Sequence, residues 1–199
     1  MSEKVTTPSN PEESPSLEDS GTDADVPTAR MLDWARNSAL YRLSRRMMTE
    51  QELGTAIRRK AKQKFEGISE PQLQALAARA IDCGRQMGGL DDQAYSASKV
   101  RAGIRGGKSR RQIADTLRRK GVSNDTVSEA LLDADDLRAA TAYARKRGFG
   151  PFRTAPADEK RLARELASLA RRGFSLDIVR RITSMEREEA EEVMADSHW

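Results

Sequence analysis

The sequence predicts an all-α protein, built as an elongated, curved stack of three tandem three-helix repeats. A glycine, an apolar residue and a serine recur in that order at Gly67-Ile68-Ser69, Gly121-Val122-Ser123 and Gly173-Phe174-Ser175, spaced 54 and 52 residues apart. A tyrosine precedes the three glycines by 26, 26 and 30 residues, at Tyr41, Tyr95 and Tyr143. Self-similarity at a nearly fixed period indicates one supersecondary unit that is used several times and packs against its neighbours.

No strand pattern competes with this interpretation. Alternating runs of β-branched and aromatic residues are absent, and between Met31 and Gly150 the only proline is Pro71. Pro71 falls in the first turn of an expected helix, where its missing N–H costs little. The apolar content of 37% and aromatic content of 5% suit small helical units in a row better than one large core.

Each repeat is expected to contain three short helices, the first of which carries the tyrosine. The second helix begins at a capping box, Thr49 with Glu52 in repeat 1 and Ser109 with Gln112 in repeat 2, whereas repeat 3 offers only Asp158. The glycine of each motif ends the second helix because it adopts the left-handed conformation without a Cβ clash. The serine then caps the third helix. We expect the three tyrosines to be packing anchors, with platforms on which nucleic-acid bases stack as the alternative.

These signals divide the chain into five segments: a disordered acidic tail (1–30), repeat 1 (31–84), repeat 2 (85–136), repeat 3 (137–185) and an acidic C-terminal end (186–199). The tail holds four of the seven prolines and few large apolar residues, a composition typical of disorder. Residues 1–30 carry a net charge of −5, and 186–196 carry another −5. Because the whole chain has a net charge of +4, residues 31–185 carry +14.

The basic excess recurs with the repeat and predicts a basic face. Clusters of cations are expected to close the second helices, and others lie at the start of repeat 2 and near residue 146. As a stripe on the stack they would attract a phosphate backbone or an acidic protein groove. The alternative is that cations at helix C-termini only interact favourably with the helix dipole and are otherwise exposed to solvent, with no role in binding. The predicted face consists of Arg58, Arg59, Lys60, Arg101, Arg105, Lys108, Arg110, Arg111, Arg118, Arg119, Lys120, Arg145, Lys146, Arg147, Arg171 and Arg172.

We expect no catalytic, cofactor-binding or metal-binding site. The only histidine, His198, is next to the last residue, and Cys83 has no histidine partner and is expected to be buried and inert. The acidic pair Asp91-Asp92 is interpreted as a helix cap. The run from Gly103 to Ser109 lacks the strand and spacing of a phosphate loop, so we expect a turn between helices.

The chain is expected to be cytoplasmic and monomeric. It contains no apolar run near 18 residues that would cross a membrane and no basic-then-apolar leader for secretion. Its single cysteine permits no internal disulfide, which fits a reducing compartment.

At this point the sequence resembles the RecX family of regulators of the bacterial RecA recombinase. Short motifs carry the resemblance over residues 31–185: the segment Gly89–Tyr95, the run from Gly107-Lys108-Ser109 to Arg118-Arg119-Lys120-Gly121-Val122, and the late segment Leu169–Ser175. Ala39-Leu40 with Leu43, Arg46 and Glu52-Leu53 add to it. Ser96, Pro151, Pro156 and the long acidic tail depart from the family pattern.

The resemblance implies a non-enzymatic protein that lies in the groove of the RecA filament on DNA. It implies inhibition of ATP hydrolysis, strand exchange and co-protease activity in recombinational repair and the SOS response, with RecA and single- or double-stranded DNA as partners. One alternative is a stand-alone DNA-binding protein that uses a three-helix unit like a helix-turn-helix. The acids around Asp125 and Glu129 in the last helix of repeat 2 argue against it. A purely structural adaptor is the other alternative.

Overall fold

The structure, a computed structural model, describes residues 25–195, which form ten α-helices and one 3-10 helix. The described residues contain no strand, which confirms the all-α class. The elements are α1 (Ala29–Leu43), α2 (Glu50–Lys64), α3 (Glu70–Gln86), α4 (Asp92–Arg105), α5 (Arg110–Arg119), α6 (Asn124–Ala130), α7 (Asp136–Arg147), η1 (Gly150–Phe152), α8 (Glu159–Arg171), α9 (Leu176–Ser184) and α10 (Arg187–Ala195).

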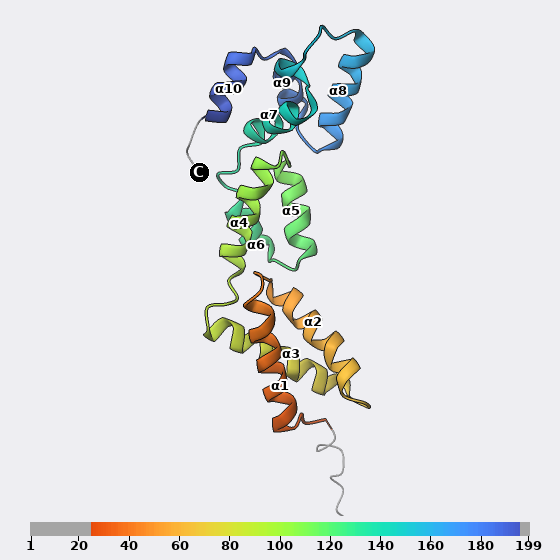
Figure 1. Cartoon of the computed structure of the whole chain (residues 1–199), viewed down its shortest axis with the longest axis vertical. Coiled ribbons are helices and arrows are strands. Elements are labelled where there is room, and N and C mark those ends of the chain that lie inside the picture. The colour runs from red at the N-terminus through yellow and green to blue at the C-terminus, as the bar shows by residue number, and fades with distance from the viewer. Residues whose placement is uncertain (1–24, 196–199) are drawn as a thin grey trace, which may run out of the picture.

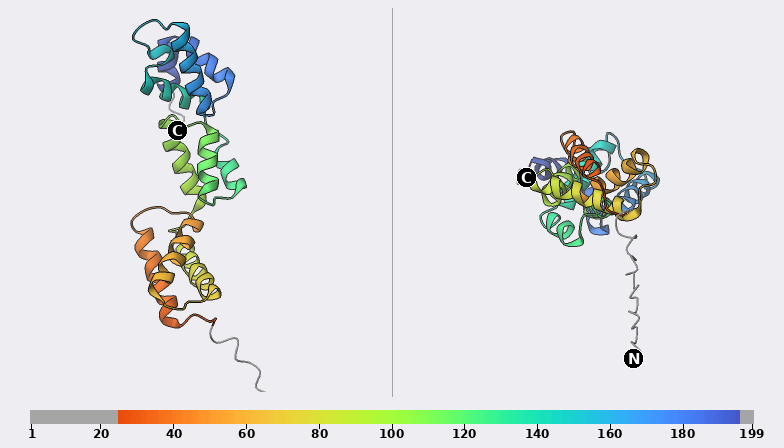
Figure 2. Two further views of the ribbon diagram at one scale, coloured as in Figure 1. Left: turned by 90° about the vertical axis from the view of Figure 1, so that its right-hand side faces the viewer. Right: turned by 90° about the horizontal axis from the view of Figure 1, so that it is seen from below.

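The helices form an elongated stack of three groups, with α1–α3 at one end, α4–α6 in the middle and α7–α10 at the other end (Figure 1). Turning the molecule shows the same elongation (Figure 2). The middle helices α2, α5 and α8 follow one side of the stack in Figure 1. None of the helices in residues 25–195 is both long and apolar enough to cross a membrane.

The repeated serines act as the sequence predicts, and the repeated glycines do so in two of the three repeats. Gly67, Gly121 and Gly173 have φ angles of 69°, 80° and 82°, the left-handed region that L side chains rarely adopt. The serines that follow cap α3, α6 and α9, each accepting a hydrogen bond from the backbone N–H three residues later. In repeats 2 and 3 the glycine directly follows the C-cap of the middle helix, and the serine starts the third helix. In repeat 1 the prediction is wrong for the glycine, because α2 ends at Lys64 with the extended residue Phe65 as its C-cap, and Gly67 lies in the turn that leads to Ser69.

The caps of the middle helices differ from one another. Thr49 and Glu52 form both bonds of the predicted capping box at α2. At α5 only half of the predicted box forms: Ser109 accepts from the Gln112 N–H, but the buried Gln112 Oε1 has no hydrogen-bond partner within residues 25–195. Asp158 caps α8 by accepting from the Arg161 N–H at 2.7 Å.

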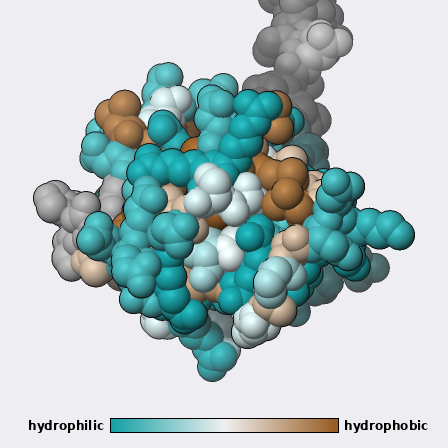
Figure 3. Space-filling model, turned by 90° about the horizontal axis from the view of Figure 1, so that it is seen from above, coloured by the Kyte–Doolittle hydropathy of each residue, from teal (hydrophilic) through white to brown (hydrophobic). Residues whose placement is uncertain are grey.

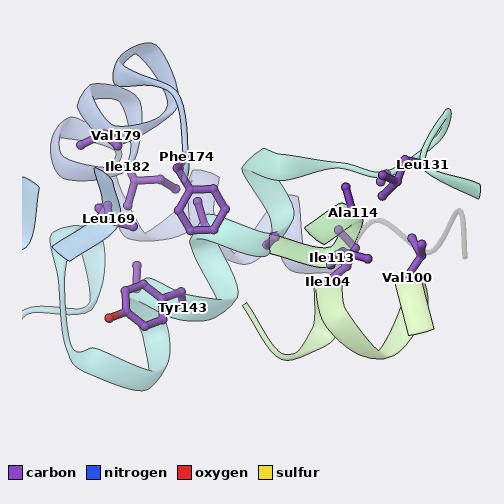
Figure 4. Packing of buried hydrophobic residues seen from close by; sticks show 14 of the residues in the cluster. Val100, Ile104, Ile113, Ala114, Leu131, Tyr143, Leu169, Phe174, Val179 and Ile182 are labelled. Atoms are coloured by element: carbon purple, nitrogen blue, oxygen red, sulfur yellow. The ribbon is translucent and has the colours of Figure 1, made fainter. Parts of the chain in front are cut away.

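Two apolar cores hold the stack together. The core of repeat 1 draws on α1, α2 and α3, with Leu53, Ile57 and Leu76 fully buried, and ends at Leu90. Repeats 2 and 3 share one continuous core, which runs from Tyr95 to Ala190. Figure 4 shows part of it, with Ile104 and Ile113 of repeat 2 in the same cluster as Leu169 and Ile182 of repeat 3.

The two ends of the chain are defined more closely by the structure. Residues 25–30 were expected to belong to the acidic tail, yet α1 begins at Ala29 and Thr28 caps it. At the other end, α10 packs against α7 and buries Ala190 completely, so this acidic segment is part of the fold. The rest of the predicted tail (1–24), and His198 and Trp199, lie outside the described residues.

The expectation that all three tyrosines are packing anchors is wrong for one of them. Tyr95 and Tyr143 are 4% and 7% exposed, but Tyr41 is 60% exposed. The reason lies in the stack: Tyr143 lies against Gly107 of the preceding repeat, whereas Tyr41 belongs to repeat 1 and no described repeat precedes it.

Consecutive repeats are joined by a polar contact that occurs twice. We call the contact between repeats 1 and 2 the first joint and that between repeats 2 and 3 the second joint. At the first joint the buried Thr49 hydroxyl donates to the Lys120 carbonyl at 2.5 Å. At the second joint the buried Ser109 hydroxyl donates to the Arg172 carbonyl, also at 2.5 Å. The N-terminus of each middle helix therefore meets the C-terminus of the next, an arrangement that the helix dipoles favour.

Paired aspartates complete both joints. Asp91 caps α4, and its neighbour Asp92 lies beside the Glu50 backbone at the start of α2. In the next repeat Asp135 caps α7, and Asp136 accepts from the Arg110 N–H at 2.6 Å. The interpretation of Asp91-Asp92 as a cap is confirmed for Asp91, and in the second pair Asp136 also caps the middle helix of the preceding repeat.

Candidate basic interface

The predicted basic residues close the middle helices in two of the three repeats. α5 ends at Arg119 and α8 ends at Arg171, as expected. In repeat 1 the expectation is wrong, because α2 continues to Lys64 and the cluster from Arg58 to Lys60 lies inside the helix. The reason is length: α2 has 15 residues and α5 has 10.

Several predicted residues have structural partners. The Lys120 Nζ lies 2.5 Å from the Glu52 Oε1 across the first joint. The Arg172 guanidinium lies 4.3 Å from the centre of the Tyr143 ring in repeat 3. Arg58 pairs with Glu70. The Arg118 Nε donates to the Asn124 Oδ1 at 3.0 Å. These side chains stabilise the fold as well as contributing charge.

The charges at the first joint shift the pKa values of both partners. Burial acts to raise the pKa of Glu52, but hydrogen bonds from Lys120 and from the Thr49 N–H outweigh it, and the pKa is lowered. The bond to Glu52 raises the pKa of Lys120. The ion pair is therefore formed at neutral pH, and Lys120 belongs to the joint.

Weaker contacts occupy a second group. The Lys60 Nζ donates to Gln63, the Arg119 Nε to the Asp115 carbonyl and the Lys146 Nζ to the Gly106 carbonyl, at 3.2–3.4 Å. Arg110 lies in the field of Asp136, and the Arg147 guanidinium lies 5.7 Å from the centre of the Phe149 ring. All five side chains are exposed and keep donors for a ligand.

The remaining predicted residues are exposed and form no side-chain hydrogen bond or ion pair with any other residue in 25–195. Such unpaired guanidinium and ammonium groups are the ones free to contact phosphate or carboxylate groups of a partner. They are Arg59, Arg101, Arg105, Lys108, Arg111, Arg145 and Arg171.

The structure adds cations that the sequence analysis did not include in the face. Arg42, Arg45 and Arg46 at the end of α1 line a hollow at the first joint together with Arg59 and Arg119. In repeat 3, Arg161 and Arg164 line another hollow with Arg147 and Arg171. The signal was available at α1, where three arginines lie within five residues. The three arginines were not included in the predicted face because they lie before the middle helix, and the repeated cation clusters were sought in the middle helices.

The residues considered for chemistry have structural roles. Cys83 is buried, with its Sγ 3.7 Å from the Met87 Sδ. Gly106 and Gly107 form the predicted turn between α4 and α5. Within residues 25–195 no group of three histidine, cysteine or acidic side chains is arranged to hold a metal ion.

Comparisons with known proteins identify the family. The family described as "RecX, second three-helix domain" matches residues 91–131, which lie within repeat 2. The Regulatory protein RecX of Agrobacterium fabrum (strain C58 / ATCC 33970) is 50% identical over 171 residues, 86% of this chain and 93% of that protein. The chain belongs to the RecX family. The Regulatory protein RecX of Myxococcus xanthus (strain DK1622) is 34% identical over 160 residues, 75% of this chain and 83% of that protein.

A solved structure of this family supports the fold. The crystal structure of RecX from Lactobacillus salivarius superposes with a TM-score of 0.62, covering 83% of this chain and 99% of that one, at 21% identity. The resemblance on which the sequence analysis relied is therefore confirmed, and the chain is a homologue of RecX regulatory proteins.

Proposed function

We propose that this RecX-family chain binds the RecA filament on DNA and inhibits its ATP hydrolysis, strand exchange and co-protease activity, as a monomer and without catalysis of its own. The observation that carries the proposal is the set of exposed, unpaired cations distributed along an elongated stack. A long, narrow protein with such side chains on successive repeats suits an extended, negatively charged partner better than a compact one.

The joints and the turns are assigned a supporting role in this proposal. Lys120 joins repeats 1 and 2 through its carbonyl and its side chain, and Arg172 joins repeats 2 and 3 through its carbonyl. The side chains offered to the partner are the unpaired ones, above all Arg101, Arg105 and Arg111 of repeat 2. The acidic N-terminal residues are proposed to compete for the basic surface, because their net charge is opposite to that of residues 31–185.

The stand-alone DNA-binding function is the second candidate. It would place the third helix of a repeat in the major groove. In repeat 2 this helix, α6, has only seven residues and exposes Asp125 and Glu129, which repel phosphate. We therefore rank it below regulation of RecA.

The test is a titration of the chain into RecA during DNA-dependent ATP hydrolysis. Wild type is compared with a triple variant, Arg101→Gln, Arg105→Gln and Arg111→Gln, and with a control that loses the same charge from exposed arginines outside the predicted face, Arg36→Gln, Arg79→Gln and Arg180→Gln. We expect inhibition by wild type and by the control, and at least tenfold weaker inhibition by the triple variant. No effect of wild type on RecA, alongside tight and salt-dependent binding to bare DNA, would favour the second candidate.

A further inference from the structure

A basic hollow lies at the first joint, between the end of α1, the start of α2 and the end of α5. We call it the joint groove. It has a volume of about 480 Å³ and is lined by residues of both repeats. Its cations are Arg42, Arg45, Arg46, Arg59, Arg119 and Lys120, and its only acid is Glu52. Such an excess of one sign in a concave site favours an anionic ligand.

The single acid does not offset this charge. Glu52 accepts from the Lys120 Nζ at 2.5 Å and from the Thr49 N–H at 3.4 Å, and its carboxylate lies 3.9 Å from the Arg46 guanidinium. The arginines beside it have donors to spare: the Arg42 Nε is buried and has no hydrogen-bond partner within residues 25–195. Arginine forks suit phosphate groups, and a buried donor without a partner costs free energy until a ligand pairs with it.

An aromatic platform lies on the wall of the joint groove. Tyr41 is 60% exposed, unlike the tyrosines at the corresponding places in repeats 2 and 3. The Arg45 guanidinium lies 4.7 Å from the centre of its ring. Exposed aromatic rings with a neighbouring arginine are the surfaces on which unpaired nucleic-acid bases stack.

The groove continues along α1. A second cavity of about 600 Å³ shares Tyr41 and Arg42 with the joint groove and adds Trp34 and Phe65, whose rings are 5.3 Å apart. Arg30, Lys60 and Lys64 line it as well. Cations therefore alternate with aromatic rings over two adjoining hollows, a track too large for one phosphate ion.

We propose that the joint groove and the adjoining cavity along α1 bind single-stranded nucleic acid, with the arginines holding the phosphodiester backbone and Tyr41 stacking on a base. The inference deepens the proposed function, on which it rests for its biological setting, by assigning contact with the strand to repeat 1 and the first joint. A duplex keeps its bases stacked inside the helix and offers no face to Tyr41. An acidic peptide would use the cations but would leave the ring uncovered.

The test is the binding of a fluorescent single-stranded oligonucleotide, and of its duplex, measured by anisotropy without RecA. Tyr41 is exposed, so its substitution leaves the fold intact. Stacking contributes about 1–3 kcal/mol per base, which is about five- to a hundredfold in affinity, and Tyr41→Ala is expected to weaken single-strand binding by that factor. Tyr41→Phe keeps the ring and is expected to bind within about twofold of wild type. Duplex binding is expected to be the same for all three.

The charge contribution is tested with a matched pair. Arg45→Gln is expected to weaken single-strand binding and to reduce its salt dependence by roughly 0.7 per contact in a log–log plot. Arg79→Gln, an equal loss of charge on the exposed side of α3, is the control and is expected to change neither. In a Trp199→Phe background, Trp34 is the only tryptophan, and its fluorescence should change on binding of the strand.

The outcomes separate this inference from the proposed function. Three results would overturn the groove assignment, even where wild type still inhibits RecA. The first is that Tyr41→Ala binds the single strand as tightly as wild type, and the second is that it loses as much affinity for the duplex as for the single strand. The third is that a poly-glutamate peptide displaces the strand and that Trp34 fluorescence does not change when the strand binds. Loss of single-strand binding in Tyr41→Ala, while wild type leaves RecA unaffected, would support the groove and count against the proposed function.

Discussion

The two joints of the stack share a polar framework but differ in what surrounds it. At both, a buried hydroxyl donates to the carbonyl at the C-terminus of the next middle helix, and an aspartate lies at the N-terminus of the preceding one. At the second joint α4 also packs against α7, and one apolar core continues across it. At the first joint the core of repeat 1 stops at Leu90.

One position shows the difference most clearly. Gly107 lies two residues before the Ser109 cap and has a φ angle of 73°. It is packed closely against Tyr143: a Cβ atom added at Gly107 would lie 2.9 Å from the Tyr143 backbone N and Cα. The matching residue at the first joint is Met47, which is 51% exposed. Repeats 2 and 3 therefore form one packed body, and repeat 1 is attached to it mainly through polar contacts. We expect repeat 1 to move and to unfold separately.

The largest effect is expected from breaking the larger body at Glu165. This carboxylate is 1% exposed and accepts from Arg153 at 2.6 Å, from Arg161 and from the Gly150 N–H, which holds η1 in place. Glu165→Ala leaves the Arg153 charge without its partner and is expected to cost about 3–5 kcal/mol. Glu52→Ala at the first joint is expected to cost about 1 kcal/mol, because Lys120 is half exposed. Urea denaturation measures both, and equal losses would contradict the comparison.

Gly107→Ala is expected to cause the next largest loss of stability. The added Cβ meets backbone atoms and the φ angle is positive, so the loss is expected to be about 3 kcal/mol. Met47→Ala, at the matching position, is expected to stay within about 0.5 kcal/mol of wild type. A similar midpoint of unfolding for both variants would show that the second joint is no tighter than the first.

The cap hydroxyls test whether the joints hold equally well without their polar contact. Thr49→Ala and Ser109→Ala each remove a cap and are expected to cost about 1 kcal/mol. Small-angle scattering should distinguish them: Thr49→Ala releases repeat 1 and broadens the distribution of shapes, whereas the shared core keeps repeats 2 and 3 together in Ser109→Ala. A broader distribution for Ser109→Ala alone would reverse the assignment.

The smallest effect is a difference in pH dependence. The pKa of Glu52 is below its ordinary value of 4.5, so its contribution to stability is complete above pH 4.5 and is lost as the pH falls through the lowered pKa. The matching residue at the second joint is Gln112, which does not titrate. Burial raises the pKa values of Asp92 and Asp136, which favours the folded state as the pH falls, but it does so at both joints.

The measurement compares urea unfolding of wild type and of Glu52→Gln at pH 6 and pH 3.5. Wild type is expected to lose up to about 1 kcal/mol more than the variant over this range. A variant that loses as much as wild type would mean that the first joint does not respond to acid.

Most helix boundaries in the three repeats could be predicted from the sequence, because glycine, serine and threonine act within one turn. The end of α2 at Lys64 and the helix α10 were not predicted, because no such local signal marks them. The joints could not be predicted from the sequence, since Thr49 bonds to a residue 71 positions away. The exposure of Tyr41 could not be predicted from the sequence either, because the corresponding tyrosines in repeats 2 and 3 are buried. The joint groove could not be predicted for the same two reasons. It includes the exposed Tyr41, and its arginines near the end of α1 lie beside Arg119 only because repeats 1 and 2 are in contact.

The cap of the third middle helix differs from the other two in the hydrogen bonds that it can form. A hydroxyl at this position can accept from its own helix and donate to the next repeat at the same time, as Thr49 and Ser109 do. Asp158 as a carboxylate can only accept. The end of the molecule beyond it is largely hydrophilic, as the view from above shows (Figure 3). The cap of the third middle helix therefore lacks the donor through which Thr49 and Ser109 reach the following repeat.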